Sequence, residues 1–462
     1  MTETIAAIAT GLTESGIGII RISGADSYDI IRKIFQTKNG CVPDLEKSHR
    51  VHYGFIVDNV SRETLDEVLL LNMKAPHSYT GEDTIEIDCH GGILMMRRIL
   101  DNVLKVGARF AEPGEFTKRA FLNGRLDLSQ AESVIDVISA KNDKALHASV
   151  AQLKGSLSKK VKAYRALLLE DTAYIEAALD DPEHIELEGF SEKLVNDVDE
   201  TLSGLDALIR SAEDGRFMRE GIQTVIVGKP NAGKSSLMNA LLGEERAIVT
   251  DIAGTTRDTL EEQINLKGVS LNVIDTAGIR ETEDVVEKIG VQRALNAAEQ
   301  ADLIIYVVDS SVALDESDRQ ILHFLSDKQK RAIVLLNKSD LVPLVTAETL
   351  RGLLPLNTYI LQISAKQETG IDELEKQIEE LFYSGTISSN EEIYITSVRQ
   401  KEALTAARES LLQVKASIAA GMSEDFFTID LMNAYTQLGY ILGEEVDEDL
   451  VNEIFSKFCM GK

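Results

Sequence analysis

The sequence predicts a multidomain chain of α/β and α+β class. Short apolar runs alternate with glycine turns and two helical stretches in the N-terminal part, which is typical of an α+β domain. Apolar residues at helical spacing occupy two separate stretches, which indicates one discontinuous α-helical domain. Between those stretches, β-rich apolar runs alternate with helical ones, which predicts an inserted domain with a doubly wound α/β sheet.

The domain boundaries are expected where this periodicity changes. A chain of 462 residues is long enough for about three domains. We expect the α+β domain at residues 1–120, the first part of the helical domain at 121–215, the inserted domain at 216–383 and the second part of the helical domain at 384–462.

The N-terminal domain contains an arginine in an unusual place. Its strands are expected at residues 4–10, 16–22, 67–71 and 84–88, and its helices at 27–35 and 93–106. Arg21 interrupts the apolar run of the second strand. A buried guanidinium there would need an anionic or acceptor-rich partner, whereas an arginine on an edge strand would point to water. The residues by themselves leave both alternatives open.

The helical domain begins with a helix start signal. Ser129 and Glu132 have the spacing of a capping box. Helical spacing continues over residues 131–179, the segment Asp180–Pro182 ends it, and more helix follows. Helical periodicity resumes after residues 385–390 and continues to the C-terminus.

The inserted domain opens with a phosphate-binding motif. Residues 228–235, Gly-Lys-Pro-Asn-Ala-Gly-Lys-Ser, fit G-x-x-x-x-G-K-[ST], a loop whose main-chain N–H groups hold phosphate oxygens at a helix N-terminus. A strand is expected before the loop at 222–227 and a helix after it at 236–242, which is the context that this motif requires. Lys234 is expected to neutralise the β- and γ-phosphates, and the Ser235 hydroxyl to ligate Mg²⁺.

A second motif follows the next predicted strand. Residues 275–278, Asp-Thr-Ala-Gly, come directly after the β-rich run 269–274. Asp275 stands where a second carboxylate near the metal is needed, and Gly278 offers a main-chain N–H to the γ-phosphate.

A third motif indicates that the base is guanine. Residues 337–340, Asn-Lys-Ser-Asp, end the predicted strand 332–336. The Asp340 carboxylate can accept two hydrogen bonds from the guanine N1–H and 2-amino groups, which adenine cannot supply, and a site built on such pairing rejects the analogue strongly. Residues 364–366, Ser-Ala-Lys, follow the predicted strand 359–363 and are expected to complete the pocket through a main-chain N–H. The three motifs together predict a GTP-binding domain.

Hydrolysis of GTP needs a separate explanation. Ras-like GTPases place a water-orienting glutamine directly after the glycine of the second motif, where this chain has Ile279. One alternative is a slow switch that needs an activating partner. The other is catalysis through Asn231, which offers a side-chain oxygen inside the phosphate loop, and residues 250–258, which could supply carbonyl oxygens and the Thr256 hydroxyl. A monovalent cation held there could stabilise the transition-state charge.

Composition limits the other possibilities. The formal charge of −28 argues against autonomous tight binding to nucleic-acid backbone, and the dense basic spots, Arg97–Arg98 and Lys159–Lys162, are typical of solvated helix faces. The three cysteines include no C-x-x-C pair, and the seven histidines are scattered, so neither a disulfide framework nor a metal cluster is expected. No lysine or arginine precedes Arg21, and no apolar run approaches the ~20 residues of a membrane span. We therefore expect a cytoplasmic protein with no membrane span.

Further motifs lie mostly outside the inserted domain. They are residues 16–24 (Gly-Ile-Gly-Ile-Ile-Arg-Ile-Ser-Gly), 79–82 (Tyr-Thr-Gly-Glu), 90–92 (His-Gly-Gly), 112–116 (Glu-Pro-Gly-Glu-Phe), 120–128 (Ala-Phe-Leu-Asn-Gly-Arg-Leu-Asp-Leu), 254–258 (Gly-Thr-Thr-Arg-Asp) and 458–462 (Phe-Cys-Met-Gly-Lys). Over the whole chain, these motifs resemble those of the tRNA-modification GTPases of the MnmE/TrmE family. The terminal motif is the most distinctive, because generic GTPases carry nothing like it.

The resemblance implies a fold, an activity and partners. The N-terminal domain would be a tetrahydrofolate-binding fold through which the chain forms a homodimer, and the inserted domain a Ras-like P-loop GTPase. An FAD-dependent partner of the MnmG/GidA type would form a heterotetramer or larger complex with it, and tRNA would bind mainly with that partner. 5,10-methylene- or 5-formyl-tetrahydrofolate would supply a one-carbon unit for an aminomethyl-type (carboxymethylaminomethyl) group at C5 of the wobble uridine of certain tRNAs. GTP hydrolysis, stimulated by K⁺ as GTPase domains dimerise, would drive the conformational cycle.

The resemblance also implies roles for single residues. K⁺ would be held by Asn231, Thr250, Ile252 and Thr255, and Mg²⁺ by Ser235 and Thr256. Glu287 would be the catalytic residue that compensates for Ile279, together with Asn231, Lys234, Thr256 and Gly278. Folate would be contacted by Arg21, Glu82, Arg125 and Lys462. The nucleotide-binding residues would be Asn231, Ala232, Gly233, Lys234, Ser235, Ser236, Thr250, Asp251, Ile252, Ala253, Gly254, Thr255, Thr256, Asp275, Thr276, Ala277, Gly278, Asn337, Lys338, Asp340, Ser364, Ala365 and Lys366.

Two other functions compete with this one. A regulatory or ribosome-assembly GTPase would be expected to carry basic RNA-binding modules, which this acidic chain lacks. A folate-dependent one-carbon transferase with an attached GTPase would act without a partner, yet no redox or nucleophile motif is visible. Cys459 is a possible nucleophile, although a packing residue at a helix end is the ordinary expectation for it.

Overall fold

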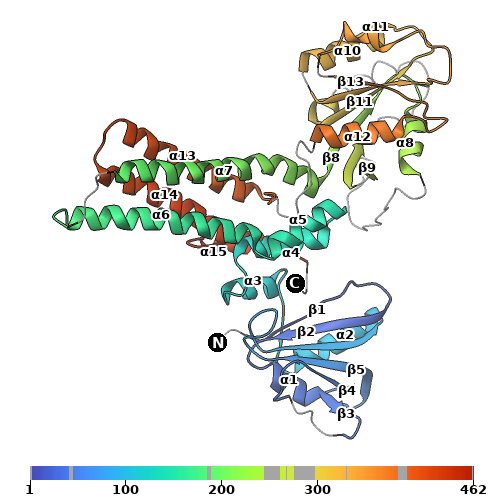
Figure 1. Cartoon of the computed structure of the whole chain (residues 1–462). Coiled ribbons are helices and arrows are strands. Elements are labelled where there is room, and N and C mark those ends of the chain that lie inside the picture. The colour runs from blue at the N-terminus through green and yellow to red at the C-terminus, as the bar shows by residue number, and fades with distance from the viewer. Residues whose placement is uncertain are drawn as a thin grey trace. The chain divides into compact units, whose positions relative to one another are not determined.

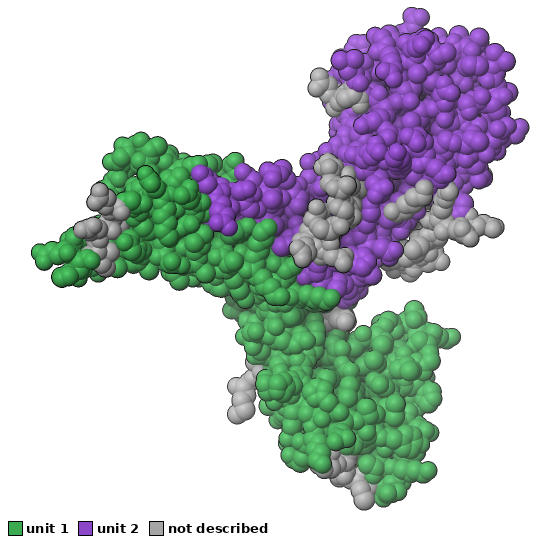
Figure 2. All heavy atoms as spheres, viewed as in Figure 1, with its two compact units in different colours: residues 1–135, 152–198, 406–462 green, residues 136–151, 199–405 purple. Residues whose placement is uncertain are grey.

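The computed structural model of the chain describes residues 3–40, 45–184, 189–243, 261–266, 268–274, 297–328, 330–356, 358–382, 393–459 and 461. The chain divides into two compact units, which Figure 2 distinguishes by colour. Unit 1 comprises Met1–Ile135, Gln152–Val198 and Ala406–Lys462, and unit 2 comprises Asp136–Ala151 and Asp199–Thr405.

A mixed sheet of seven strands forms the N-terminal part of unit 1 (Figure 1). Its strand order is β3-β4-β5-β6-β2-β1-β7, and neighbouring strands are antiparallel except for the parallel pair β1–β7. The strands are β1 (Ile5–Ile8), β2 (Ser15–Ser23), β3 (Phe35–Thr37), β4 (Arg50–Val57), β5 (Thr64–Met73), β6 (Thr84–Gly91) and β7 (Arg109–Phe110). The strands predicted at 4–10, 16–22, 67–71 and 84–88 correspond to β1, β2, β5 and β6.

One face of this sheet is covered by helices. Alternate strand residues, including Ile20 and Ile22 of β2 and Ile85 and Ile87 of β6, are fully buried in one core with α1 (Ser27–Ile34) and α2 (Ile93–Lys105). Because side chains of a strand alternate between faces, the residues between these isoleucines lie on the opposite face. Arg21 and Glu86 are those residues, and they are direct partners in the β2–β6 ladder. β2 lies between β6 and β1, so the edge-strand alternative for Arg21 is wrong.

The helical prediction holds on both sides of the inserted segment. The helices are α3 (Glu115–Leu122), α4 (Leu128–Ser139), α5 (Asp143–Leu153), α6 (Ser156–Asp180), α7 (Phe190–Glu220), α13 (Val398–Ala419), α14 (Glu424–Leu442) and α15 (Glu448–Ser456). Within unit 1, α6 packs against α14 although the two are separated by the whole inserted segment (Figure 1). The fold therefore contains a discontinuous helical part, as the periodicity predicted.

The capping box of α4 differs from the predicted one. The helix begins at Leu128, so Ser129 lies inside its first turn. Asp127 Oδ1 accepts a hydrogen bond from the Gln130 main-chain N–H at 3.1 Å, and Gln130 Oε1 accepts one from the Asp127 N–H at 3.1 Å. The reciprocal pair is therefore Asp127 and Gln130, and the assignment to Ser129 and Glu132 is wrong. Both pairs satisfy the same sequence pattern, two residues apart.

The last helix packs against the region just after the N-terminal sheet. Phe455 and Phe458 are buried in a core with Ala120, Leu128 and Val134. Gly114, which precedes α3, has φ +70°, and a Cβ at this position would lie 2.4 Å from the main-chain oxygen of Phe455. A glycine is therefore required where α15 and α3 meet.

Unit 2 contains a six-stranded sheet of order β13-β12-β11-β8-β10-β9. The pairs are parallel except for the antiparallel β10–β9 pair at one edge. The strands are β8 (Ile222–Val227), β9 (Glu261–Leu266), β10 (Val269–Ile274), β11 (Leu303–Asp309), β12 (Ala332–Asn337) and β13 (Tyr359–Gln362). The bounds of β8 and β10 are those that the sequence predicted.

Helices cover both faces of this sheet. One core contains Leu303, Ile305 and Val307 of β11 and includes residues of α8 (Lys234–Leu242) and α12 (Ile371–Phe382). A second core contains the alternate residues Ile304 and Tyr306 and includes residues of α10 (Glu316–Lys328) and α11 (Ala347–Arg351). Burial on both faces explains why these strands are continuous apolar runs in the sequence. The doubly wound α/β domain is confirmed.

Candidate functional site

The phosphate loop connects β8 to α8, as predicted. Its Gly228 has φ +152°, and a Cβ there would lie 2.4 Å from the main-chain oxygen of Val307. Gly233 has φ +100° and precedes the first residue of α8. Asn231 adopts φ +63°, a left-handed conformation that asparagine tolerates better than most residues. The loop therefore bends sharply across the edge of the sheet and ends at the N-terminus of α8, the geometry that holds phosphate.

The loop lysine has a defined position. Lys234 Nζ donates hydrogen bonds to the main-chain oxygens of Gly228 and Lys229, both at 2.8 Å. The ammonium group therefore lies over the loop, where a phosphate would meet it. Ser235 and Ser236, in the first turn of α8, are exposed.

Asn337 joins the phosphate loop to the predicted base pocket. The residue is 3% exposed. Its Nδ2 donates to the main-chain oxygen of Ala232 at 2.8 Å, and its Oδ1 accepts from the Ala365 main-chain N–H at 3.0 Å. A Cβ at Gly233 would lie 2.1 Å from the same Nδ2. Three segments that are far apart in the sequence therefore meet at one buried amide.

Asp340 is oriented from the neighbouring segment. The Ser364 hydroxyl donates to Asp340 Oδ1 at 2.7 Å, and this bond holds the pKa of the Asp340 carboxyl below its ordinary value. Asp340 is exposed, whereas Asn337, Ser364 and Ala365 beside it are buried. Lys366 lies in the same segment and is also exposed. An acceptor-only group in this place suits the donor edge of guanine.

Asp309 is a site residue that the motifs did not reveal. It ends β11 directly opposite Asn337 in the ladder, and its Oδ2 accepts a hydrogen bond from Lys338 Nζ. Burial alone would raise the pKa of Asp309, but hydrogen bonds from Lys338 and Ser311 hold it below its ordinary value. Its position in the sequence could have identified it, because it ends the apolar run that forms β11. The carboxyl ends of neighbouring parallel strands meet at one edge of a sheet.

Several predicted GTPase residues lie outside the described part of the chain. They are Thr250, Asp251, Ile252, Ala253, Gly254, Thr255, Thr256, Asp275, Thr276, Ala277, Gly278 and Glu287. Among the residues that the structure does describe, no cluster of three or more histidine, cysteine or acidic side chains is arranged to hold a metal ion. The described Mg²⁺ and K⁺ candidates are thus Ser235 and Asn231.

A second polar site lies at the N-terminal sheet, around Arg21. Arg21 Nε donates to Glu86 Oε1 at 2.7 Å, and Nη1 donates to the main-chain oxygen of Gly461 at 3.1 Å. The Arg21 side chain is half-buried, and both partners are acceptors of the kind expected for a guanidinium in this place. The Arg21 guanidinium lies 5.4 Å from the centre of the Tyr79 ring, and that of Arg125 lies 5.0 Å from it. Arg21 and Arg125 thus share one aromatic residue.

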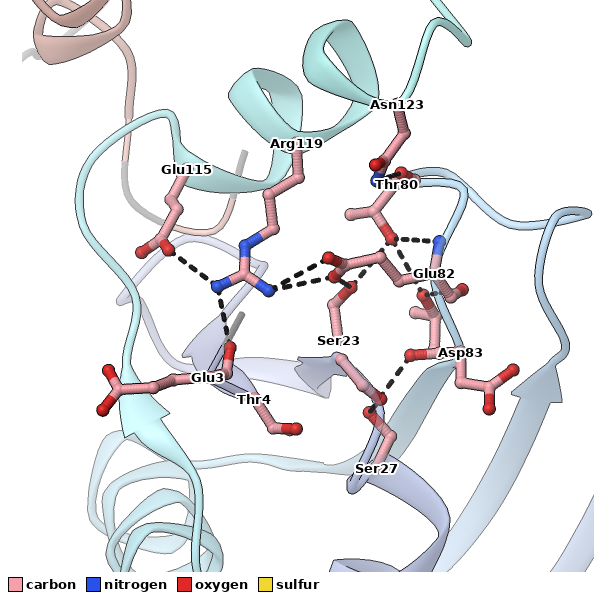
Figure 3. A network of polar contacts seen from close by, with 12 residues as sticks. Glu3, Thr4, Ser23, Ser27, Thr80, Glu82, Asp83, Glu115, Arg119 and Asn123 are labelled. Atoms are coloured by element: carbon pink, nitrogen blue, oxygen red, sulfur yellow. Dashed lines mark hydrogen bonds and ion pairs between the residues drawn. The ribbon is translucent and has the colours of Figure 1, made fainter. Parts of the chain in front are cut away.

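Glu82 lies in a dense network of hydrogen bonds that Figure 3 shows. Its carboxylate accepts from Ser23 Oγ at 2.8 Å and from Arg119 Nη1 at 3.0 Å. Arg119 Nη2 also donates to Glu115 Oε1 at 2.9 Å and to the main-chain oxygen of Glu3 at 2.8 Å. Arg119 and Glu115 were missed in the sequence, although their (i, i+4) spacing on a helix was a signal of pairing.

The C-terminal tail reaches this second site. Gly461 has φ +84°, and a Cβ there would lie 2.4 Å from the main-chain oxygen of Ile8. Cys459 is exposed whereas Phe458 is buried, so the packing role expected of the cysteine is wrong. Lys462 lies outside the described residues.

The sheet of unit 2, the phosphate loop and the hydrogen-bonded side chains of Asn337 and Asp340 define the class of P-loop GTP-binding proteins. A family model described as the MnmE helical domain matches residues 128–459, and one described as GTP-binding protein TrmE N-terminus matches residues 4–125. The tRNA modification GTPase MnmE of Lachnoclostridium phytofermentans is 60% identical over 462 residues, covering 100% of both chains. That of Clostridioides difficile is 49% identical over 464 residues, covering 100% of this chain and 99% of its own. The chain therefore belongs to the MnmE family of tRNA modification GTPases, and it is a GTP hydrolase.

Solved structures of other GTPases also overlap with part of the chain. The G domain of the FeoB iron transporter of T. maritima is 28% identical and covers 34% of this chain and 97% of its own, with a TM-score of 0.26.

Within the described residues, we find no helix with the length and apolar character that crossing a bilayer requires.

Proposed function

We propose that this GTPase acts with an FAD-dependent partner of the MnmG/GidA type. The pair would form a carboxymethylaminomethyl-type group at C5 of the wobble uridine of certain tRNAs, with a one-carbon unit from 5,10-methylene- or 5-formyl-tetrahydrofolate. In this proposal the chain is a cytoplasmic homodimer joined through its N-terminal domain, and tRNA binds mainly with the partner. The proposed domains are residues 1–120, 121–215, 216–383 and 384–462.

The site around Arg21 carries the folate part of the proposal. A folate presents a pterin edge that donates hydrogen bonds and a glutamate tail that carries carboxylates. Glu82 supplies an acceptor-only group for the first, and Arg21 and Arg125 supply cations for the second. Tyr79, which contacts both arginines, offers an aromatic face. Lys462 would add an ammonium group next to Gly461.

The GTPase part of the proposal assigns catalysis to Glu287, acting with Lys234, Thr256, Gly278 and a K⁺ ion held by Asn231. The left-handed backbone of Asn231 supports its role, because asparagine combines tolerance of φ > 0 with a side-chain oxygen. Glu287→Ala should slow hydrolysis and leave GTP affinity nearly intact, since such a group acts mainly in the transition state. Weaker GTP binding with normal turnover of bound GTP would make Glu287 a structural residue.

Calorimetry tests the folate site directly. 5-Formyltetrahydrofolate is titrated into the full chain, into a chain that ends at Phe458 and into Arg21→Met. Both changes should abolish binding, because each removes part of the contact between Arg21 and the tail. GTP affinity serves as the control and should stay unchanged. Equal folate binding by all three proteins would remove the tail and Arg21 from the site.

Nucleoside analysis tests the tRNA reaction. Mass spectrometry of tRNA from a deletion strain should show loss of the C5-modified wobble uridine, and the wild-type gene should restore it. A gene carrying Glu82→Gln should restore less, because a neutral amide is a poorer acceptor and a poorer partner for Arg119. An unchanged nucleoside profile in the deletion strain would contradict the proposal.

A further inference from the structure

The second residue of the phosphate loop makes contacts that the three GTPase motifs do not explain. Lys229 Nζ lies 2.7 Å from Asp318 Oδ2 and 2.9 Å from Asp315 Oδ2. The lysine side chain is only 16% exposed and that of Asp318 only 1%. A lysine of the phosphate loop is therefore bound to two carboxylates at the start of α10.

These carboxylates are also held in place by hydrogen bonds that do not involve the lysine. Asp315 Oδ1 accepts from the main-chain N–H groups of Ser317 at 3.0 Å and Asp318 at 3.2 Å. Asp318 Oδ2 in turn accepts from the Asp315 N–H at 3.1 Å, which completes a reciprocal cap of α10. The Tyr306 hydroxyl of β11 donates to Asp318 Oδ1 at 2.7 Å. Lys229 thus binds a fixed point of the domain rather than two mobile side chains.

The main chain of Lys229 serves the phosphate site. Its carbonyl oxygen accepts a hydrogen bond from Lys234 Nζ at 2.8 Å. The loop is also held at its other end, where Asn337 Nδ2 binds the oxygen of Ala232. Pro230 and the left-handed Asn231 lie between these two anchors. A shift of Lys229 would therefore displace the Lys234 ammonium and the loop N–H groups together.

We propose that Lys229 is a positioning residue for GTP binding, which anchors the first half of the phosphate loop to the capped N-terminus of α10. Its Nζ fixes the loop to Asp315 and Asp318, and its carbonyl oxygen thereby holds Lys234 over the phosphate position. Because the loop contacts phosphate in the ground state, loss of the anchor weakens nucleotide binding, and because it displaces Lys234 it also slows hydrolysis. This proposal is independent of folate, tRNA and K⁺.

The test uses the full chain and separates positioning from fold stability. Lys229→Met should raise the Kd for GDP and the KM for GTP by about tenfold or more and should also lower kcat, because Lys234 is displaced. This variant also leaves the Asp318 charge buried without its cation, which destabilises the fold. The double variant Lys229→Met/Asp318→Asn removes that charge. Its unfolding temperature should therefore return most of the way to that of the wild type, while its nucleotide affinity stays weak.

Lys229→Arg provides the matched rescue, because a guanidinium can still bind both carboxylates. It should keep nucleotide affinity close to that of the wild type. The proposal is overturned if the double variant regains affinity together with its unfolding temperature, because the pair would then only stabilise the fold. It is also overturned if Lys229→Met leaves Kd and KM unchanged, or if Lys229→Arg binds nucleotide as weakly as Lys229→Met does.

Discussion

Arg21 Nη1 donates a hydrogen bond to the main-chain oxygen of Gly461, 440 residues away along the chain. The contact joins an interior strand of the N-terminal sheet to the C-terminal tail. Burial of Phe455 and Phe458 brings the tail there, and the positive φ of Gly461 lets it pass Ile8. The tail is therefore part of the N-terminal site.

Gly461→Ala should disrupt this contact. A Cβ at position 461 would lie 2.4 Å from the Ile8 oxygen, so the tail must move away from Arg21. We expect affinity for 5-formyltetrahydrofolate to fall by about tenfold or more, as for loss of a charge-assisted hydrogen bond, with GTP affinity unchanged. Calorimetry measures both.

Gly421→Ala is the matched control for that change. Gly421 has φ +65°, but a Cβ there meets no atom within 4 Å. Gly421→Ala should lower the free energy of unfolding by about 1–2 kcal/mol, because alanine is strained in a left-handed backbone conformation. It should leave folate binding intact. Equal folate affinity in the two variants would show that the tail contact does not matter for the ligand.

Asp340→Asn should shift base preference from guanine toward xanthine. The Ser364 hydroxyl fixes one oxygen of the side chain at 2.7 Å, so the amide nitrogen would take the outward position of the second oxygen. It would then donate to the 2-keto oxygen of xanthine, where the carboxylate accepted from the 2-amino group of guanine. Hydrolysis assays with GTP and XTP measure the ratio of kcat/KM values. An unchanged preference for GTP would contradict the guanine pocket.

Hydrolysis should be much faster in KCl than in NaCl at equal ionic strength. Sodium is smaller than potassium, so it should fit poorly in an oxygen cage of the size that potassium requires. The difference should vanish in Asn231→Gly, which removes the side-chain oxygen while keeping φ at +63° accessible. This variant is preferable to Asn231→Ala, which would also strain the loop. Equal rates of the wild type in both salts would exclude the cation from the mechanism.

Glu115→Gln should change the pH dependence of stability. Burial by itself would raise the pKa of Glu115, but bonds from Arg109, the Glu112 N–H and Arg119 hold it below its ordinary value of 4.5. A carboxyl with a lowered folded-state pKa stabilises the fold above its ordinary pKa, and this stabilisation is lost as pH falls through the folded-state pKa. At neutral pH, we expect the free energy of unfolding of the variant to be about 1–3 kcal/mol lower than that of the wild type. When the pH is lowered below the ordinary pKa, the free energy of unfolding should fall less in the variant than in the wild type.

Denaturant unfolding at neutral pH and at stepwise lower pH checks this prediction. Glu112→Gln is the control, because Glu112 is exposed three residues before Glu115 and should behave like the wild type. Parallel pH curves for the wild type and Glu115→Gln would mean that the ion pairs with Arg109 and Arg119 contribute no pH-dependent stability.

The sequence predicted the buried strands of unit 2 well and the helix start of α4 poorly. Strands such as β8 and β10 are buried on both faces, so they are continuous apolar runs whose ends are visible. The capping pattern before α4 occurs twice, at Asp127/Gln130 and at Ser129/Glu132. Which pair caps the helix depends on where the chain turns, and a local pattern does not contain that information.

The sequence predicted the GTP site, because the residues proposed to bind phosphate and guanine lie in short contiguous motifs that follow strands. The contacts between distant residues, at the GTP site and at the N-terminal site, became visible only in the folded structure. It paired Arg21 with Glu86 and Gly461, Glu82 with Arg119, and Lys229 with the cap of α10. These are contacts between side chains and elements far apart in the chain. They arise from strand order and helix packing, so they cannot be predicted from the local periodicity of the sequence.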